Sequence, residues 1–221
     1  MISSHILINK DTGWSSFDVV KKVRNLLRIK KVGHAGTLDP MATGLLIILL
    51  NDATKDFVQF QEYEKVYIAE ITFGATTDTY DAEGQVVTAY QKEFVLDKNQ
   101  VEVLLQKYTG TLLQTPPLYS AVKINGKSAY TRARKGEVFE VQPKEVTVYK
   151  ATLLSIEDSK ITVEYTVSSG TYIRSLAHDL GQEIGYGGYL SSLQRTRIGP
   201  YMLTDAKTIE DFKTEILSEI K

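Results

Sequence analysis

One segment of the 221-residue chain, residues 33–44, gathers residue types that could carry out chemistry. It holds one carboxylate, Asp39, together with His34, Pro40 and three glycines, and it directly precedes the apolar run Leu45–Leu50. Pro40 restricts Asp39 to an extended backbone, and glycine permits backbone conformations that other residues avoid. A carboxylate held on such a constrained backbone suits catalysis. The alternative is that Asp39 caps a turn, as many Asp-Pro pairs do.

The rest of the sequence excludes several other classes of enzyme. It contains no cysteine, which rules out disulfides, cysteine zinc sites, iron–sulfur clusters and thiol nucleophiles. Its three histidines, His5, His34 and His178, lack metal-ligand spacing. The glycine-rich phosphate loop, the dinucleotide fingerprint and the serine nucleophile elbow are missing from the sequence. Carboxylate chemistry or plain binding remains, and we expect no metal and no other cofactor.

The net charge of −1 and the pI of about 6.3 conceal an uneven charge distribution. No acidic residue falls between Asp18 and Asp39, whereas several basic residues do. Solvated surface charge would explain any single basic cluster, but three clusters around glycine-rich motifs favour a polyanionic partner. The clusters are Lys21, Lys22, Arg24, Arg28, Lys30 and Lys31; Lys123, Lys127, Arg132, Arg134 and Lys135; and Arg195 with Arg197.

Strands and helices that alternate irregularly must position these residues. Residues 33–44 are expected to form a loop, and Asn125-Gly126 is a hairpin signal. The order lacks regular strand–helix–strand alternation, so we expect an α+β fold with a largely antiparallel sheet. Expected strands cover residues 5–9, 45–50, 65–73, 85–90, 146–156 and 161–167, and expected helices follow Ser15, Asp97, Thr171 and Thr208.

The sequence shows no signal for export or membrane insertion. Its first ten residues lack the charged-then-apolar pattern of a signal peptide. Its longest apolar run, Leu45–Leu50, is far shorter than the ~20 residues that a transmembrane helix needs. We therefore expect a cytoplasmic protein with no membrane partner.

The segment around Asp39 resembles the catalytic motif of the TruB family of tRNA pseudouridine synthases, G-H-x-G-T-L-D-P-x-A-T-G-L-L. Further motifs of that family follow in the same order, and together they span residues 10–199. They are K-x-Y from Lys65, T-D-T-x-D-x-x-G from Thr77, Q-x-P-P-x-Y-S-A-x-K from Gln114, G-T-Y-I-R-S-L from Gly170, and a variant of L-R-R-T from Leu193.

Two positions depart from the family pattern. Asp11 follows Lys10 where the family usually has a proline, which puts the placing of Lys10 in doubt. Gln194 stands where an arginine is usual, so one phosphate contact is expected to be missing.

The resemblance implies the pseudouridine synthase fold, a mixed and mostly antiparallel central sheet flanked by helices. An RNA-clamping segment would be inserted at about residues 111–145. A single catalytic domain is expected over residues 1–221. Little more than a helix follows Thr208, so a full C-terminal RNA-binding domain of the PUA type is not expected.

The reaction implied by the resemblance is the isomerisation of uridine 55, in the T loop of tRNA, to pseudouridine. The uridine would first be flipped out of its stack. Asp39 would be the catalytic carboxylate, acting either as a nucleophile at C1′ or as a base at C2′. Arg174 would keep Asp39 ionised, and Tyr67 would stack on the flipped base.

The remaining contacts are implied by the same motifs and by the basic clusters. The expected partner is the T stem-loop of tRNA, bound by a monomer that needs no obligatory protein partner. Residues expected to bind the substrate around the base are His34, Lys10, Tyr172, Leu193, Gly36 and Thr37. Residues expected to contact the RNA backbone are Lys21, Lys22, Arg28, Lys30, Lys31, Lys123, Arg132, Arg134 and Arg195.

Three alternative functions remain open from the sequence. One is a guide-RNA-dependent, dyskerin-like pseudouridine synthase, which the short C-terminal tail argues against. Another is a tRNA-folding chaperone without turnover, which retention of Asp39, Tyr67 and Arg174 argues against. The third is a carboxylate glycosidase, which usually needs two acids that flank the bond, and only Asp78 and Asp81 are available as a second acid.

Overall fold

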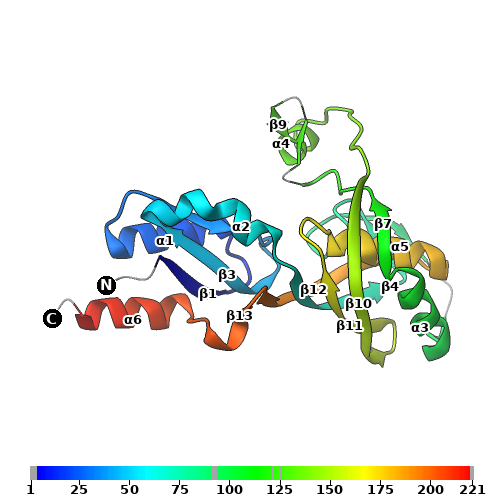
Figure 1. Cartoon of the computed structure of the whole chain (residues 1–221). Helices are drawn as coiled ribbons and strands as arrows, with labels where there is room; N and C mark the ends of the chain where they lie inside the picture. Colours follow the sequence, from blue (N-terminus) through cyan, green and yellow to red (C-terminus); the bar gives the residue numbers. More distant parts are fainter. Residues whose placement is uncertain (1–3, 91–93, 121, 125, 220–221) are drawn as a thin grey trace. The chain divides into compact units, whose positions relative to one another are not determined.

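The computed structural model describes residues 4–90, 94–120, 122–124 and 126–219. The chain forms two compact units (Figure 1). Unit 1 contains Met1–Ile68 and Leu193–Lys221, and unit 2 contains Ala69–Ser192. Unit 2 is therefore one continuous stretch of chain, whereas unit 1 is assembled from two separate stretches.

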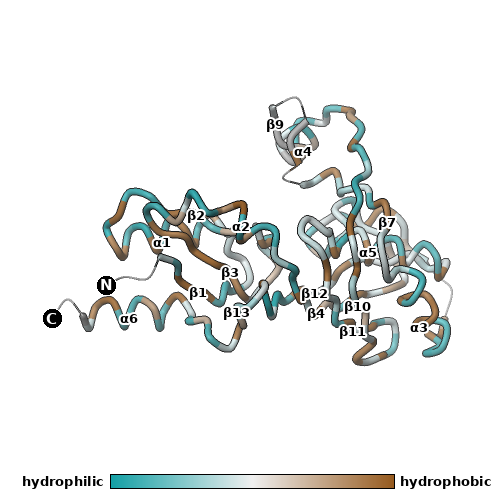
Figure 2. Tube along the Cα trace, viewed as in Figure 1, coloured by the Kyte–Doolittle hydropathy of each residue, from teal (hydrophilic) through white to brown (hydrophobic). Residues whose placement is uncertain are grey.

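Unit 1 centres on β3 (Thr43–Leu50), which is buried on both faces. Alternate residues of a strand point to opposite faces. Ile48 and its alternate neighbours pack with α1 and α6, whereas Ile47 and its alternate neighbours pack with Phe60 of α2. Burial on both faces explains why this strand is a continuous apolar run, which Figure 2 shows in brown. The other elements of unit 1 are β1 (His5–Lys10), α1 (Ser16–Leu27), β2 (Val32–Ala35), η1 (Asn51–Asp56), α2 (Phe57–Glu62), β13 (Tyr201–Met202), η2 (Leu203–Asp205) and α6 (Ile209–Glu219).

The start of α1 agrees with the prediction from the sequence. The Ser15 hydroxyl accepts a hydrogen bond from the Asp18 backbone N–H (3.1 Å), and the Asp18 carboxylate accepts one from the Ser15 backbone N–H (3.0 Å). This reciprocal capping box satisfies two backbone donors at the helix end. The helix ends at Leu27, and Arg28 follows it with a φ of 54°.

Unit 2 is built on the antiparallel hairpin of β10 (Lys144–Glu157) and β11 (Lys160–Val167), which confirms the predicted hairpin. β7 (Gly110–Gln114) pairs with the start of β10. Between these two strands lie β8 (Lys123–Ile124), β9 (Lys127–Ser128) and α4 (Ala129–Ala133), which extend away from the sheet of this unit in Figure 1. The other elements of unit 2 are β5 (Ala75–Thr77), β6 (Val86–Ala89), α3 (Lys98–Lys107) and α5 (Ile173–Ile184).

Two strands contribute residues to both units, β4 (Lys65–Phe73) and β12 (Gly188–Ile198). The strand order of the large sheet is β1-β3-β12-β4-β11-β10-β7. β12 pairs with β3 in parallel, whereas β1 with β3, β10 with β11 and β10 with β7 pair antiparallel. The predicted mixed, mostly antiparallel sheet with helices is confirmed.

One predicted element differs from the structure. Residues 33–44 were expected to be a loop throughout, but Gly33–Ala35 belong to β2, and Thr43 and Gly44 belong to β3. β2 pairs antiparallel with β3 along its whole length. Glycine and histidine have little intrinsic preference for strands, so pairing with the buried β3 overrides their local tendency.

Candidate active site

Asp39 lies in the connection between β2 and β3, which covers residues 36–42. Its side chain is half-buried, and its backbone carbonyl accepts a hydrogen bond from the N–H of Ala42 (3.1 Å). Because β2 and β3 pair directly, both ends of this loop are fixed by the sheet of unit 1. We call residues 36–42 the catalytic loop from their resemblance to the family motif. The loop therefore presents Asp39 on a backbone with little freedom.

Lys10 supports this loop from within unit 1. Its side chain is fully buried, with 0 % exposed. The ammonium donates hydrogen bonds to the backbone carbonyls of Asp11 (2.9 Å), Trp14 (2.7 Å) and Pro40 (3.3 Å). These bonds give Lys10 a positioning role for the loop, and the substrate contact expected from the sequence stays a prediction.

Arg195 supports the other side of the catalytic loop. Its side chain is 1 % exposed, and it donates to three backbone carbonyls: those of Leu45 (2.8 Å), Gly36 (3.2 Å) and Thr37 (3.3 Å). Its guanidinium is thus engaged inside the protein, and the expected contact of Arg195 with the RNA backbone stays a prediction. A basic residue looks the same in sequence whether its charge is buried or exposed.

The backbone of Arg195 also explains why a glycine ends the loop. Arg195 is paired with Gly44 in the parallel β12–β3 ladder. Gly44 has a φ of 101°, and a Cβ at this position would lie 2.4 Å from the carbonyl oxygen of Arg195. Any larger residue would push β12 away from β3 and displace the arginine that holds the loop.

Arg195→Met should lower kcat about a hundredfold, because small misplacement of a catalytic group carries a cost of that order. It should also lower the free energy of unfolding by ~2 kcal/mol, since three carbonyls lose a charged donor. Arg195→Lys should restore only part of each loss, because one ammonium lacks the planar fork. Steady-state kinetics and urea denaturation measure the two effects.

The matched control for Arg195 is Arg197→Met on the same strand. Arg197 pairs with Glu64 (2.6 Å), and both side chains are about one-third exposed. Pairs of this kind contribute ~1 kcal/mol or less, so this variant should keep its kcat. Equal kinetic losses in the two variants would contradict the positioning role of Arg195.

The positive charge of Arg195 helps to lower the pKa of two other basic residues, Lys65 and His34. Burial, with the charge of Arg195 as the second cause, lowers the pKa of Lys65 to about 8. Lys65 is buried in β4, where its ammonium donates to the carbonyls of Gln61 and Tyr63. Burial is also the main cause that lowers the pKa of His34, again with Arg195 as the second cause. The fold thus favours a neutral imidazole in β2, close to the catalytic loop.

The lowered pKa of His34 predicts a pH dependence. Above the ordinary value of 6.5 the imidazole is neutral in both states, and its contribution to stability is fully present. Below that value the unfolded chain binds more protons than the folded protein does. The free energy of unfolding therefore decreases as the pH is lowered. His34→Gln should make this fall less steep. Urea denaturation of both proteins across this range measures the difference, and identical slopes would contradict the assignment.

The remaining predicted residues of unit 1 differ in accessibility. Thr37 is exposed and Gly36 is partly exposed, so the loop can meet a ligand at these positions. Tyr67 is 9 % exposed and Leu193 is 7 % exposed. The Leu193 backbone carbonyl accepts a hydrogen bond from the Thr43 hydroxyl (3.5 Å), at the start of β3. Arg195 thus bonds directly to Gly36 and Thr37, in the same loop as Asp39. Leu193 joins this group through its hydrogen bond with Thr43, beside the β3–β12 pairing.

In unit 2, Arg174 is a buried cation in the first turn of α5, with 5 % exposed. Its guanidinium forms an ion pair with Asp81 (3.3 Å) and donates to the carbonyls of Thr79 (3.1 Å) and Tyr119 (3.0 Å). Asp81 also accepts from the Thr79 hydroxyl (2.6 Å) and from the backbone N–H of Glu83 (3.0 Å). From the sequence, Asp81 was expected only as a possible second acid, and no local pattern indicated that it pairs with Arg174.

Tyr172 immediately precedes α5, and the side chain of Gln114 holds its backbone. The Gln114 amide accepts from the Tyr172 N–H (2.7 Å) and donates to its carbonyl (3.0 Å). The Lys144 ammonium lies 5.1 Å from the centre of the Tyr172 ring, and burial lowers the pKa of Lys144. Sequence reasoning missed Lys144, because a lone lysine before a strand carries no motif.

The predicted RNA-backbone residues of α1 and of the turn after it lie at the surface. Lys21, Arg28, Lys30 and Lys31 are exposed, and Lys22 is partly exposed. In unit 2, Arg132 is less available, because it pairs with Glu137 (2.7 Å) and lies 5.2 Å from the centre of the Phe139 ring. Arg134 is exposed. The side chain of Lys123 lies outside the described part of the chain.

Neither a metal site nor a membrane-spanning helix is found among the described residues. Among them, no three His, Asp or Glu side chains come close enough together to hold a metal ion. No described helix has the length and apolar character needed to cross a bilayer.

Family models match almost the whole chain. The model of the TruB family pseudouridylate synthase N-terminal domain matches residues 24–173. The model of the tRNA pseudouridylate synthase B C-terminal domain matches residues 174–220. The first match alone covers more than half of the sequence.

Curated relatives agree with this match. The tRNA pseudouridine synthase B of Aquifex aeolicus is 45 % identical over 209 residues, which cover 94 % of this chain and 72 % of the relative. The enzyme of the same name from Thermobifida fusca is 43 % identical over 223 residues, which cover 97 % of this chain and 76 % of the relative.

Solved structures show the same fold. A crystal structure of a Cbf5–Nop10–Gar1 complex contains a chain that is 27 % identical to this one, with a TM-score of 0.75. The match covers 95 % of this chain and 53 % of that one, so this chain spans about half the length of the solved structure. An archaeal box H/ACA Nop10–Cbf5 complex matches with a TM-score of 0.71 at 23 % identity.

Proposed function

This chain belongs to the TruB family and is a tRNA pseudouridine synthase, and we propose that it isomerises uridine 55 in the T loop with Asp39 as its catalytic carboxylate. The observation that carries the proposal is the catalytic loop. Lys10 bonds to Pro40 beside Asp39, and Arg195 bonds to Gly36 and Thr37. A carboxylate held this firmly is preorganised for reaction at one position of a bound substrate.

The chemistry of the isomerisation balances without any added group. The N-glycosidic bond between C1′ and N1 of the uridine breaks, the base turns, and a bond forms between C1′ and C5. The proton on C5 leaves, and N1 gains one. Asp39 would either attack C1′ or take a proton from C2′, and both routes need its ionised form. From the motif resemblance, we also propose that Arg174 supplies the positive charge that favours this form.

The target uridine must leave its stack to reach Asp39, at a cost of a few kcal/mol. Tyr67 would stack on the flipped base and offset part of that cost. His34, Tyr172, Leu193, Gly36 and Thr37 are proposed to shape the site around the base. The exposed basic residues of α1 and the turn after it would contact the RNA backbone, together with Arg134 and other basic residues in the segment between β7 and β10.

We propose that the protein acts on tRNA as a monomer, without an obligatory protein partner. The curated relatives that match it are each named as a single synthase. The solved Cbf5 chains occur in complexes with Nop10 and Gar1, and this chain spans about half of their length. Since tRNA works in the cytoplasm, the proposed place of action is the cytoplasm.

The test of the proposed function is a modification assay on defined RNA. The protein is mixed with an unmodified tRNA transcript, and pseudouridine is mapped by chemical labelling and primer extension. A matched transcript carries cytidine at position 55. The proposal expects one modified position, uridine 55, and no product with the matched transcript. Modification at another uridine would contradict the proposed site, and activity that appears only with a guide RNA would favour the dyskerin-like alternative.

A further inference from the structure

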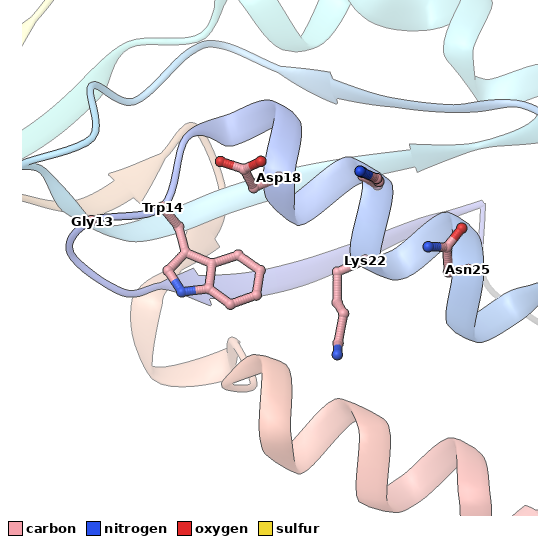
Figure 3. Close-up of a pocket in the computed structure, with 6 residues that line it drawn as sticks. Gly13, Trp14, Asp18, Lys22 and Asn25 are labelled. Atoms are coloured by element: carbon pink, nitrogen blue, oxygen red, sulfur yellow. The ribbon is translucent and has the colours of Figure 1, made fainter.

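A pocket opens in unit 1 beside the first half of α1 and outside the catalytic loop (Figure 3). Its volume of about 370 Å³ falls within the ~300–1,000 Å³ range of small-ligand sites. In Figure 3, Trp14 lies beneath the first turns of α1, and Lys22 points from α1 toward the neighbouring helix α6. The lining residues are Gly13, Trp14, Asp18, Lys21, Lys22 and Asn25.

The charges in this pocket favour an anionic ligand. Lys21 is exposed and Lys22 is partly exposed, and no ion pair engages either of them within the described chain. The acid in the lining, Asp18, is already engaged, because its carboxylate accepts from the Ser15 N–H (3.0 Å) and the Ser15 hydroxyl (2.6 Å). Glu210 of α6 also feels the charge of Lys22, but it is hydrogen-bonded to Lys213 (2.9 Å).

The position of Trp14 indicates which kind of anion the pocket would bind. It packs against the core of unit 1 and also lines the pocket. An aromatic ring beside lysine ammonium groups is the combination that binds a nucleotide, since the ring accepts the base and the ammonium groups attract the phosphate. The side-chain amide of Asn25 adds donors and an acceptor for a base edge.

Hydrogen bonds join the residues beside the pocket to the loop that carries Asp39. The Gly13 N–H donates to the Pro40 carbonyl (2.8 Å), and the Thr12 hydroxyl donates to the Met41 carbonyl (3.3 Å). The buried Lys10 ammonium joins the carbonyls of Trp14 and Pro40. RNA bound in the pocket would therefore be anchored to the same rigid backbone as Asp39.

We propose that this pocket is a second RNA site, which binds one nucleotide of the tRNA other than the target uridine. The phosphate would lie between Lys21 and Lys22, and the base would lie against Trp14. The inference rests on the proposed function for its ligand, and it adds a contact that fixes the position of the RNA relative to the catalytic loop.

Trp14 makes this proposal measurable, because it is the sole tryptophan of the chain. Its fluorescence should be quenched when an unmodified tRNA transcript is titrated into the wild-type protein. In the Lys21→Gln/Lys22→Gln double variant, half-maximal quenching should require a higher concentration of tRNA. The KM for tRNA should rise about tenfold with kcat unchanged, and the slope of log affinity against log salt should fall by about two.

The matched control is the double variant Lys55→Gln/Lys98→Gln. It removes two exposed ammonium groups that pair with Asp52 and Glu102 and that do not line the pocket. This control should keep the wild-type quenching and KM. A further titration replaces tRNA with uridine or adenosine monophosphate, which separates an RNA site from a site for free nucleotides.

Three results would overturn the proposal: tRNA turnover without any change in Trp14 fluorescence, an equal rise in KM in both double variants, or saturation by a free nucleotide at lower concentration than by tRNA. Failure of the proposed function looks different. Quenching by tRNA that depends on Lys21 and Lys22, without pseudouridine formation, would support the pocket and refute the reaction.

Discussion

Asp39→Asn should lower kcat for pseudouridine formation by at least ~10⁴-fold, a loss typical of removing a nucleophile or base. Asparagine has nearly the same shape as aspartate but carries no negative charge. It can neither attack C1′ nor remove a proton from C2′, so both proposed routes stop. Single-turnover conversion of an unmodified tRNA transcript measures the loss.

The variant must lose chemistry while it keeps RNA binding. The affinity for tRNA should stay within about threefold, because the loop is held by Lys10 and Arg195 and not by this side chain alone. Asp52→Asn is the matched control, since Asp52 is exposed and pairs only with Lys55 among the described ion pairs. An Asp39→Asn protein that turns over at the wild-type rate would exclude Asp39 as the catalytic carboxylate.

Arg174→Ala should lower the free energy of unfolding by ~3–5 kcal/mol, since it leaves the buried carboxylate of Asp81 without its cation. It should also abolish most activity if Arg174 has the proposed catalytic role. Arg174→Lys should rescue only part of both losses, because lysine lacks the planar fork whose separate nitrogens meet the Thr79 and Tyr119 carbonyls beside Asp81. Urea denaturation and tRNA turnover, measured at a temperature where each variant is folded, give the two values.

Asp81→Asn separates the structural role of Arg174 from its catalytic role. It removes the charge of the partner but keeps a hydrogen-bond acceptor, and the double-mutant cycle with Arg174→Lys measures their coupling. Two results together would support both roles. The two substitutions should be coupled in their effect on the free energy of unfolding, and the Arg174 variant should lose more turnover than Asp81→Asn does. Full recovery of turnover in Arg174→Lys would show that only the charge matters.

Local patterns in the sequence predicted the elements that depend on local interactions. Ser15 and Asp18 form the capping box that their spacing indicates, since a capping box involves residues three apart. The alternation over Lys65–Phe73 predicted β4 with its bounds, because that pattern reflects burial on one face. The β10–β11 hairpin was also predicted, because its two strands are neighbours in sequence.

Contacts between distant residues were the ones that the sequence could not predict. The motif identified Asp39 as a candidate, but the supports of its loop come from β1 and β12. Arg195 was expected to bind phosphate, and Lys10 was expected to bind substrate, because nothing local marks either charge as buried. The partner of Arg174 within unit 2, Asp81, was missed for the same reason. In each case, the structure adds a defined contact within the protein that no local pattern in the sequence indicates.

The assembly of unit 1 from two stretches of chain has a consequence during synthesis. Arg195 follows Thr37, one of the residues it holds, by 158 positions. A chain that leaves the ribosome N-terminus first would expose the Asp39 loop early and complete unit 2 next, before its anchor in β12 emerges. A nascent or prematurely terminated chain would thus contain the proposed catalytic carboxylate in an unsecured loop. Competence for the reaction would arrive only after β12 has been synthesised, so activity depends on a strand that is made long after the loop it secures.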